Sequence, residues 1–225
     1  MNQRKFYPEQ RIIPIYLGKF RITIPKISIN YRFLFLFLSF QFFSPINHGM
    51  ALQNTLDLFD FRHQDTSGRW MIVNDGVMGG VSESRLFLDE KGFLVFEGRV
   101  SLDYGGGFAS VRSLINELDA NSYQGILIKF RGDGKKYQLR LRHQDRIDGV
   151  SYFQHFQTEE KKWMEVFLPF SRFQASYRGR LLPNHRKLDT KRISQIGLMI
   201  SDKQEGLVQL EIWRIALFRE DNLKT

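Results

Sequence analysis

The chain of 225 residues is 42% hydrophobic and 14% aromatic and has 18 glycines, so it can form a globular core joined by many tight turns. It contains no cysteine, which excludes disulfide bonds, thiolate metal sites and cysteine nucleophiles. The net charge of +9 is concentrated in residues 1–49, where seven basic residues accompany one acidic residue, and the other 176 residues carry only +3. The charge therefore does not indicate a nucleic-acid-binding surface.

Residues 1–49 differ in kind from the sequence that follows. Four prolines and an alternating pattern in residues 21–29 disfavour the long amphipathic helix of a mitochondrial presequence. The apolar run of residues 33–43 has 11 residues, about half of the ~20 that a membrane-spanning helix needs. Three interpretations stay open: an over-extended reading frame upstream of a start at Met50, an export signal, or a membrane-associated or organellar leader. The first would make the protein cytoplasmic and the others exported or organellar.

After Met50, short alternating or apolar runs recur between turn residues, and no long stretch keeps apolar residues at helical spacing. The pattern predicts strands at residues 69–73, 85–89, 93–102, 107–112, 124–130, 136–143, 151–157, 162–168, 194–200 and 206–218. The clearest is 136–143, where apolar and polar side chains alternate strictly. In residues 206–218 the alternation changes phase near Ile212 and Trp213, which requires a β-bulge or a crossover between sheets.

This succession of strands, without helices to connect parallel neighbours, favours an all-β fold: an antiparallel two-sheet jelly-roll sandwich. Residues 114–121 are expected to form a short helix or a loop, and residues 171–192 an irregular surface excursion. We therefore expect residues 1–49 to be a non-globular extension and residues 50–225 to form a single β-sandwich domain.

Several long motifs resemble those of the complex I intermediate-associated protein 30 family. They are RWMIVNDGVMGGVS at 69–82, FEGRVSL at 96–102, GGGFASVR at 105–112, WMEVFLPF at 163–170, Phe173 and IGLMISD at 196–202. The motifs occur in the order and spacing of the family, and the resemblance covers nearly all of residues 57–219. Residues 1–49 have no counterpart in it.

The resemblance implies a galactose-binding-like jelly roll, in agreement with the strand pattern. For mitochondrial members of the family it also implies a role in assembling respiratory complex I, through contact with assembly intermediates and not through turnover of a substrate. In photosynthetic lineages a similar domain is fused to a dehydrogenase-like fold and linked to photosystem biogenesis. This chain has no G-x-G-x-x-G pattern after a strand, so we expect no nucleotide-binding half.

The expected partners are therefore proteins, namely subunits or intermediates of a respiratory or photosynthetic complex. We expect no nucleic acid among them, and membrane contact only through the partner or through residues 33–43.

Residues 74–80 are the first candidate for partner binding, because residues that favour turns lie on both sides of an apolar pair, Val77 and Met78. In one interpretation the segment is a recognition loop with an apolar tip beside Asn74 and an anionic Asp75. In the other it only connects two strands, with Met78 turned inward.

The polar side of residues 136–143 is the second candidate. Its arginines could bind a partner's carboxylates through their guanidinium groups, or could lie on a solvated strand face. The candidate partner-binding residues are thus Asn74, Asp75, Val77, Met78, Arg140 and Arg142.

No catalytic residue, cofactor or metal site is expected, because the five histidines show no metal-binding spacing. Gly105–Gly107 lacks the helix and the lysine of a phosphate-binding loop and predicts a hairpin turn. Two alternative functions stay open. One is a carbohydrate-binding module, suggested by the jelly roll alone. The other is a cryptic enzyme that uses His143 and His155 with Asp145 and Asp148 as acid–base groups.

Overall fold

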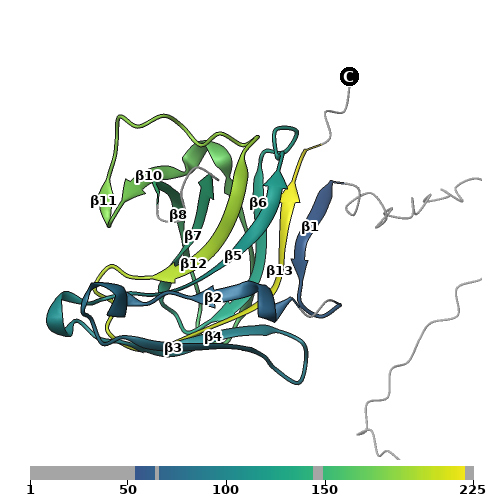
Figure 1. Cartoon of the computed structure of the whole chain (residues 1–225). Coiled ribbons are helices and arrows are strands. Elements are labelled where there is room, and N and C mark those ends of the chain that lie inside the picture. The colour runs from purple at the N-terminus through teal and green to yellow at the C-terminus, as the bar shows by residue number, and fades with distance from the viewer. Residues whose placement is uncertain (1–53, 64–65, 144–148, 221–225) are drawn as a thin grey trace, which may run out of the picture. The chain divides into compact units, whose positions relative to one another are not determined.

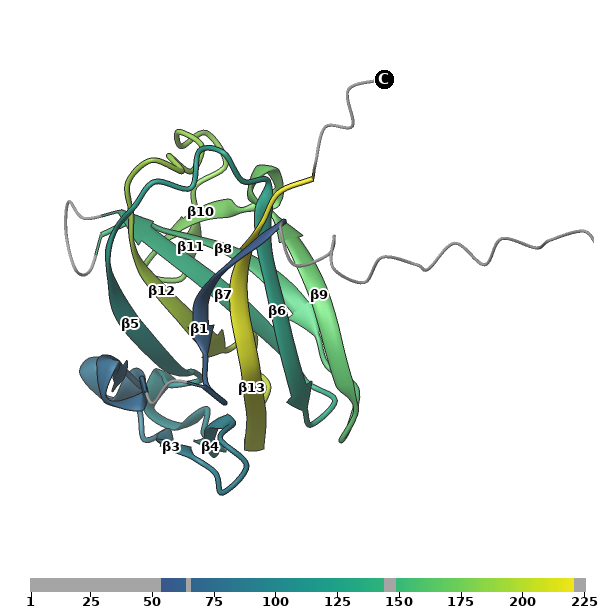
Figure 2. The same ribbon diagram turned by 90° about the vertical axis from the view of Figure 1, so that its right-hand side faces the viewer.

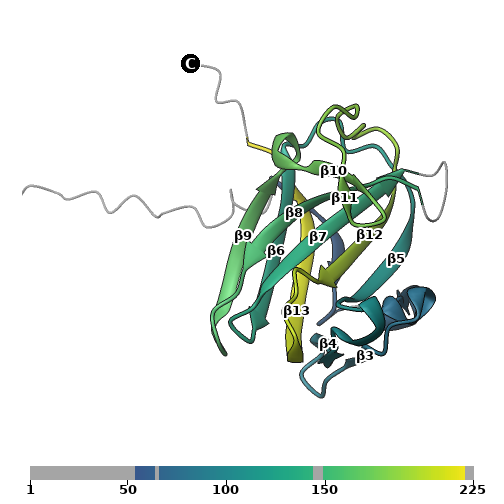
Figure 3. The same cartoon turned by 90° about the vertical axis from the view of Figure 1, so that its left-hand side faces the viewer.

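The computed structural model describes residues 54–63, 66–143 and 149–220, which form two antiparallel β-sheets packed face to face (Figure 1). Figure 2 looks toward the first sheet and Figure 3 toward the second. The expected all-β sandwich is confirmed. Four short 3-10 turns accompany the strands: η1 (Ser67–Arg69), η2 (Asp75–Met78), η3 (Asp103–Gly105) and η4 (Phe170–Arg172). Within the described ranges, no helix has the length and apolar character needed to cross a membrane.

The first sheet has the strand order β3-β4-β13-β6-β9, and β1 also pairs with β13. Its strands are β1 (Thr55–Asp60), β3 (Glu83–Leu88), β4 (Leu94–Val100), β6 (Gly125–Gly132), β9 (Trp163–Pro169) and β13 (Gly206–Phe218). The first half of β13 pairs with β4 and its second half with β1. The predicted bulge is confirmed, because the register of β13 against β6 shifts between Ile212 and Arg214.

The second sheet has the strand order β11-β10-β8-β7-β12-β5-β2. Its strands are β2 (Trp70–Ile72), β5 (Ala109–Leu118), β7 (Lys136–His143), β8 (Ser151–Gln157), β10 (Gln174–Tyr177), β11 (Arg180–Leu181) and β12 (Ile193–Ile200). In β7 the residues Tyr137, Leu139 and Leu141 are at most 1% exposed, as the alternation predicted. They belong to a continuous core that apolar side chains from both sheets fill.

Three expectations from the sequence are wrong. Of residues 114–121, those up to Leu118 are neither a helix nor a loop. They belong to β5, whose ladder with β12 continues as far as the pair Leu118–Ile193. The excursion at 171–192 contains β10 and β11, which pair with each other. Gly105–Gly107 is no hairpin turn, since it lies in the connection from β4 in the first sheet to β5 in the second.

Gly98 is required where β3 and β4 pair, opposite Ser84. A Cβ atom at Gly98 would lie 2.1 Å from the carbonyl oxygen of Glu83 and 2.7 Å from the Cα of Ser84, both of which are backbone atoms held in the ladder. Gly98→Ala should therefore lower the free energy of unfolding by about 1–3 kcal/mol, the usual effect of overpacking. Urea unfolding measures this.

Gly68→Ala is the matched control, because a Cβ atom at Gly68 would meet nothing within 4 Å. We expect its effect to stay within about 0.5 kcal/mol. Equal stabilities of the two variants would contradict the proposed crowding between β3 and β4.

Candidate functional site

The segment from Asn74 to Ser82 folds around the carboxylate of Asp75, which is only 1% exposed. The backbone N–H of Ser82 donates to Oδ1 at 2.9 Å, and its hydroxyl donates to Oδ2 at 2.5 Å. The backbone N–H groups of Gly107 and Phe108 also donate to Oδ2, at 2.7 and 3.2 Å. One carboxylate thus joins this segment to the connection that crosses between the two sheets.

These hydrogen bonds determine the charge state of Asp75. Burial by itself raises the pKa of a carboxyl group, because it disfavours the charged form. At Asp75 the hydrogen bonds from Ser82, Gly107 and Phe108 outweigh burial and hold the pKa below its ordinary value. The buried side chain is therefore an anion at neutral pH.

The glycines around Asp75 allow the chain to approach this carboxylate closely. A Cβ atom on Gly80 would lie 2.4 Å from the Asp75 carboxyl carbon, and one on Gly106 would lie 2.6 Å from its Oδ2. Gly79 has φ of +94°, in the left-handed region that favours glycine. The two glycine-rich motifs of the sequence thus make the pocket for one buried anion.

The sequence left the position of the loop's apolar tip open, and the structure shows it exposed. Val77 and Met78 are 72% and 67% exposed, so the interpretation with Met78 turned inward is wrong. Val81, Leu102 and Tyr104, on the same two segments, are exposed as well. We call these five residues the apolar tip.

The expected anionic contact at Asp75 is wrong, because the buried carboxylate is engaged with Ser82 and the backbone. Asn74 is half-buried, and its Oδ1 accepts hydrogen bonds from the Ser84 hydroxyl at 2.9 Å and the Ser110 N–H at 3.3 Å. Both side chains therefore hold the loop in place. Of the four loop candidates, only Val77 and Met78 offer their side chains to a partner.

Arg140 lies on the outward side of β7, in register with Gly197 of β12 and Phe153 of β8. Its guanidinium carbon lies 5.4 Å from the centre of the Phe153 ring. Nη1 donates to Oε1 of Gln138 at 2.5 Å. Nη2 donates to the hydroxyl of Ser176 at 3.1 Å and to that of Ser151. Arg142 projects on the same side, where its Nη1 donates to Oε1 of Gln195 at 2.9 Å.

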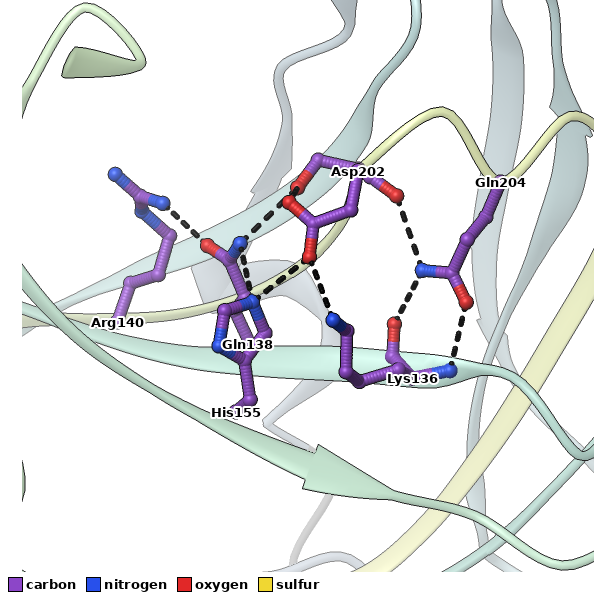
Figure 4. Close-up of polar contacts among 7 residues, drawn as sticks. Lys136, Gln138, Arg140, His155, Asp202 and Gln204 are labelled. Atoms are coloured by element: carbon purple, nitrogen blue, oxygen red, sulfur yellow. Dashed lines mark hydrogen bonds and ion pairs between the residues drawn. The ribbon is translucent and has the colours of Figure 1, made fainter. Parts of the chain in front are cut away.

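A polar network continues from Gln138 toward the end of β12 (Figure 4). Asp202 lies 2.9 Å from Nε2 of His155 and 3.2 Å from Nζ of Lys136. Burial raises the pKa of Asp202, but hydrogen bonds from Lys136 and Ser201 and the charges of His155 and Lys136 lower it by more. The network therefore holds a carboxylate anion at this edge of the sheet.

The structure does not bring His143 and His155 together. The register of β7 and β8 places His155 opposite Gln138, five residues from His143, which is roughly 16 Å along a strand. His143 instead accepts a hydrogen bond from the backbone N–H of Asp189 at 3.1 Å. Asp145 and Asp148 lie outside the described residues.

No local sequence pattern predicts the Asp202–His155 contact, because 47 residues separate the two positions. In the part of the chain that the structure describes, no group of three or more His, Asp or Glu residues could hold a metal ion.

Comparison with known proteins connects this geometry to one family. A family model described as complex I intermediate-associated protein 30 matches residues 59–212. The mouse mitochondrial protein of that name is 27% identical over 190 residues, covering 72% of this chain and 56% of the mouse protein. The corresponding Drosophila melanogaster protein is 26% identical over 182 residues, covering 71% and 62%. The chain thus spans less than two thirds of the length of these relatives.

Among solved structures, a family 11 carbohydrate-binding module from Clostridium thermocellum superposes with a TM-score of 0.58 at 16% identity, covering 73% of this chain and 95% of the module. An agarase shows a TM-score of 0.51 at 13% identity, covering 75% of this chain and 25% of the enzyme. At these identities the similarity shows a shared β-sandwich fold.

Asp75→Ala should lower the free energy of unfolding at pH 7 by about 2–4 kcal/mol, because it leaves buried N–H groups without an acceptor. The folded-state pKa of Asp75 is lowered, so the charge-dependent stabilisation is complete above the unfolded pKa of about 3.9. It is lost as the pH falls through the folded pKa. The deficit of the variant should therefore shrink below about pH 4, which urea unfolding at pH 7, 5, 4 and 3 measures.

Asp103→Asn is the control, because Asp103 is exposed in the neighbouring turn η3. Its effect should stay within about 0.5 kcal/mol. A deficit of Asp75→Ala that stays constant down to pH 3 would contradict the stabilising role of the ionised carboxylate.

Proposed function

Because this chain belongs to the complex I intermediate-associated protein 30 family, we propose that it is a non-enzymatic binding module that assists the assembly of respiratory complex I or a related membrane complex. In this proposal the domain binds a protein subunit or intermediate and catalyses no reaction. The support from comparison is the family match over residues 59–212, together with the names of the mouse and fly relatives.

The observation that carries the proposal is the exposed apolar tip on a firmly held loop. Exposed apolar side chains are stabilised when a partner removes them from water, by about 25 cal/mol for each Å² covered. Met78 adds an adaptable side chain of the kind common at binding surfaces. The buried Asp75 fixes the backbone beneath the tip, so little conformational entropy is lost on binding.

The contacts of His155 do not match those of a histidine that activates a side-chain nucleophile. Such a histidine has the hydroxyl or thiol of a serine, threonine or cysteine within hydrogen-bond reach. Among the described residues, the polar contacts of His155 are with Asp202 and Gln138, and no hydroxyl group contacts its ring nitrogens. Asp202 in turn contacts Lys136, which fits a stabilising network between strands.

The double variant Val77→Ser, Met78→Ser tests the proposal. The tagged full chain would be incubated with detergent-solubilised membranes from cells that are assembling complex I, and mass spectrometry would quantify the complex I subunits captured. We expect the variant to capture at least about tenfold less, as for loss of a central contact. Its stability should change by no more than about 0.5 kcal/mol for each exposed site.

Phe167→Ser is the control, because Phe167 is 40% exposed on β9, at the opposite edge of the first sheet from β3, the strand that follows the loop. It should capture as well as the unchanged chain. If the unchanged chain captures no more complex I subunits than an unrelated β-sandwich protein does, the proposed function is wrong. Equal capture by the tip variant and the unchanged chain would remove the tip from the binding site.

A further inference from the structure

The strands of the two sheets differ in their balance of basic and acidic residues. Strands of the first sheet contain five basic and six acidic residues, whereas strands of the second contain five basic residues and one acidic residue. In the first sheet, three arginines each form an ion pair with a carboxylate: Arg85 with Glu97, Arg131 with Glu211, and Arg214 with Asp57. The second sheet thus carries an excess of positive charge.

Arg140 occupies the middle of this positive sheet without a carboxylate in contact. Within the described residues, its guanidinium bonds only to neutral groups, on Gln138, Ser151 and Ser176. Burial and, to a lesser extent, the charge of Arg142 lower its pKa to about 10, against an opposing contribution from Asp202. Arg140 is therefore a half-buried cation at neutral pH, a state that a bound anion would stabilise.

The surroundings of Arg140 fit a ligand that lies across the strands. The strand pairing places Arg112, Gly197, Arg140, Phe153 and Gln174 in one row across β5, β12, β7, β8 and β10. Gly197 has no side chain, so none fills the position between Arg112 and Arg140. At the other end of the row, Phe153 and Gln174 help to line a hollow of about 480 Å³ that also includes Arg172 and His155.

We propose that the outer face of the second sheet binds an acidic peptide segment of the partner, with an aspartate or glutamate carboxylate on the guanidinium of Arg140. A carboxylate is compact enough to reach a half-buried guanidinium, and its two oxygens match the planar set of donors that an arginine presents. The chain's own residues 1–49 carry six excess positive charges, so a foreign segment matches the face better. This inference rests on the proposed function and names the chemistry of the partner.

A fluorescein-labelled hexaglutamate peptide tests the site with the purified full chain, and a hexaglutamine peptide is its neutral counterpart. Fluorescence anisotropy should show saturable binding of hexaglutamate but not of hexaglutamine. Added salt should weaken the binding of hexaglutamate. Arg140→Met should weaken that binding by about tenfold or more, as for loss of a charged hydrogen bond. Arg140→Lys, which keeps the charge but loses the planar fork, should weaken it less.

Arg85→Met is the matched control, because it removes one positive charge from the first sheet, where Arg85 is exposed and paired with Glu97. It should change the affinity for hexaglutamate by less than about twofold, as expected for a distant surface charge. Thermal melts of each variant verify that the chain is folded.

Three results would overturn the inference: no saturable binding of hexaglutamate, equal weakening by Arg140→Met and Arg85→Met, or binding of phosphatidylserine vesicles or inorganic phosphate in preference to the peptide. The peptide measurement needs no complex I. Its failure therefore leaves the capture experiment on the apolar tip unaffected, and failure of that capture leaves the peptide result standing.

Discussion

The buried carboxylate of Asp75 is the interaction on which the arrangement of the loops depends. It accepts hydrogen bonds from Ser82 and from the N–H groups of Gly107 and Phe108, more than thirty residues away. A buried anion is stable only when such donors surround it. The long motifs at 69–82 and 105–112 are therefore explained largely by one polar contact, which also presents the exposed apolar tip to solvent.

The fold could be predicted from the sequence where one face of a strand packs in the core and the other faces solvent. The bounds expected for residues 136–143, 151–157 and 206–218 agree with β7, β8 and β13, and the phase change in the last of these is the observed bulge. The sequence did not reveal β1, because its register shifts between Asp57 and Phe59 and breaks the alternation on which the prediction relies. Residues 114–118 were missed because their pairing with β12 is long-range.

The candidate sites were less predictable, because their properties come from residues distant in the sequence. Exposure of Met78 follows from the burial of Asp75, whose donors lie on another connection. The alternation of apolar and polar residues in 136–143 predicted that Arg140 points away from the core. Its neutral hydrogen-bond partners Ser151 and Ser176, however, lie on β8 and β10, which are distant in the sequence. Partner binding at Val77, Met78, Arg140 and Arg142 stays a prediction.

The position of β13 has a consequence for how the protein reaches its native state. This last strand pairs with β4, β6 and β1, so the centre of the first sheet is missing until residues 206–218 are available. During synthesis the hairpin of β3 and β4 would emerge from the ribosome with one edge unpaired. Such edges invite aggregation, and pairings this distant in sequence fold slowly. We therefore expect the nascent domain to depend on chaperones until its C-terminal strand has left the ribosome.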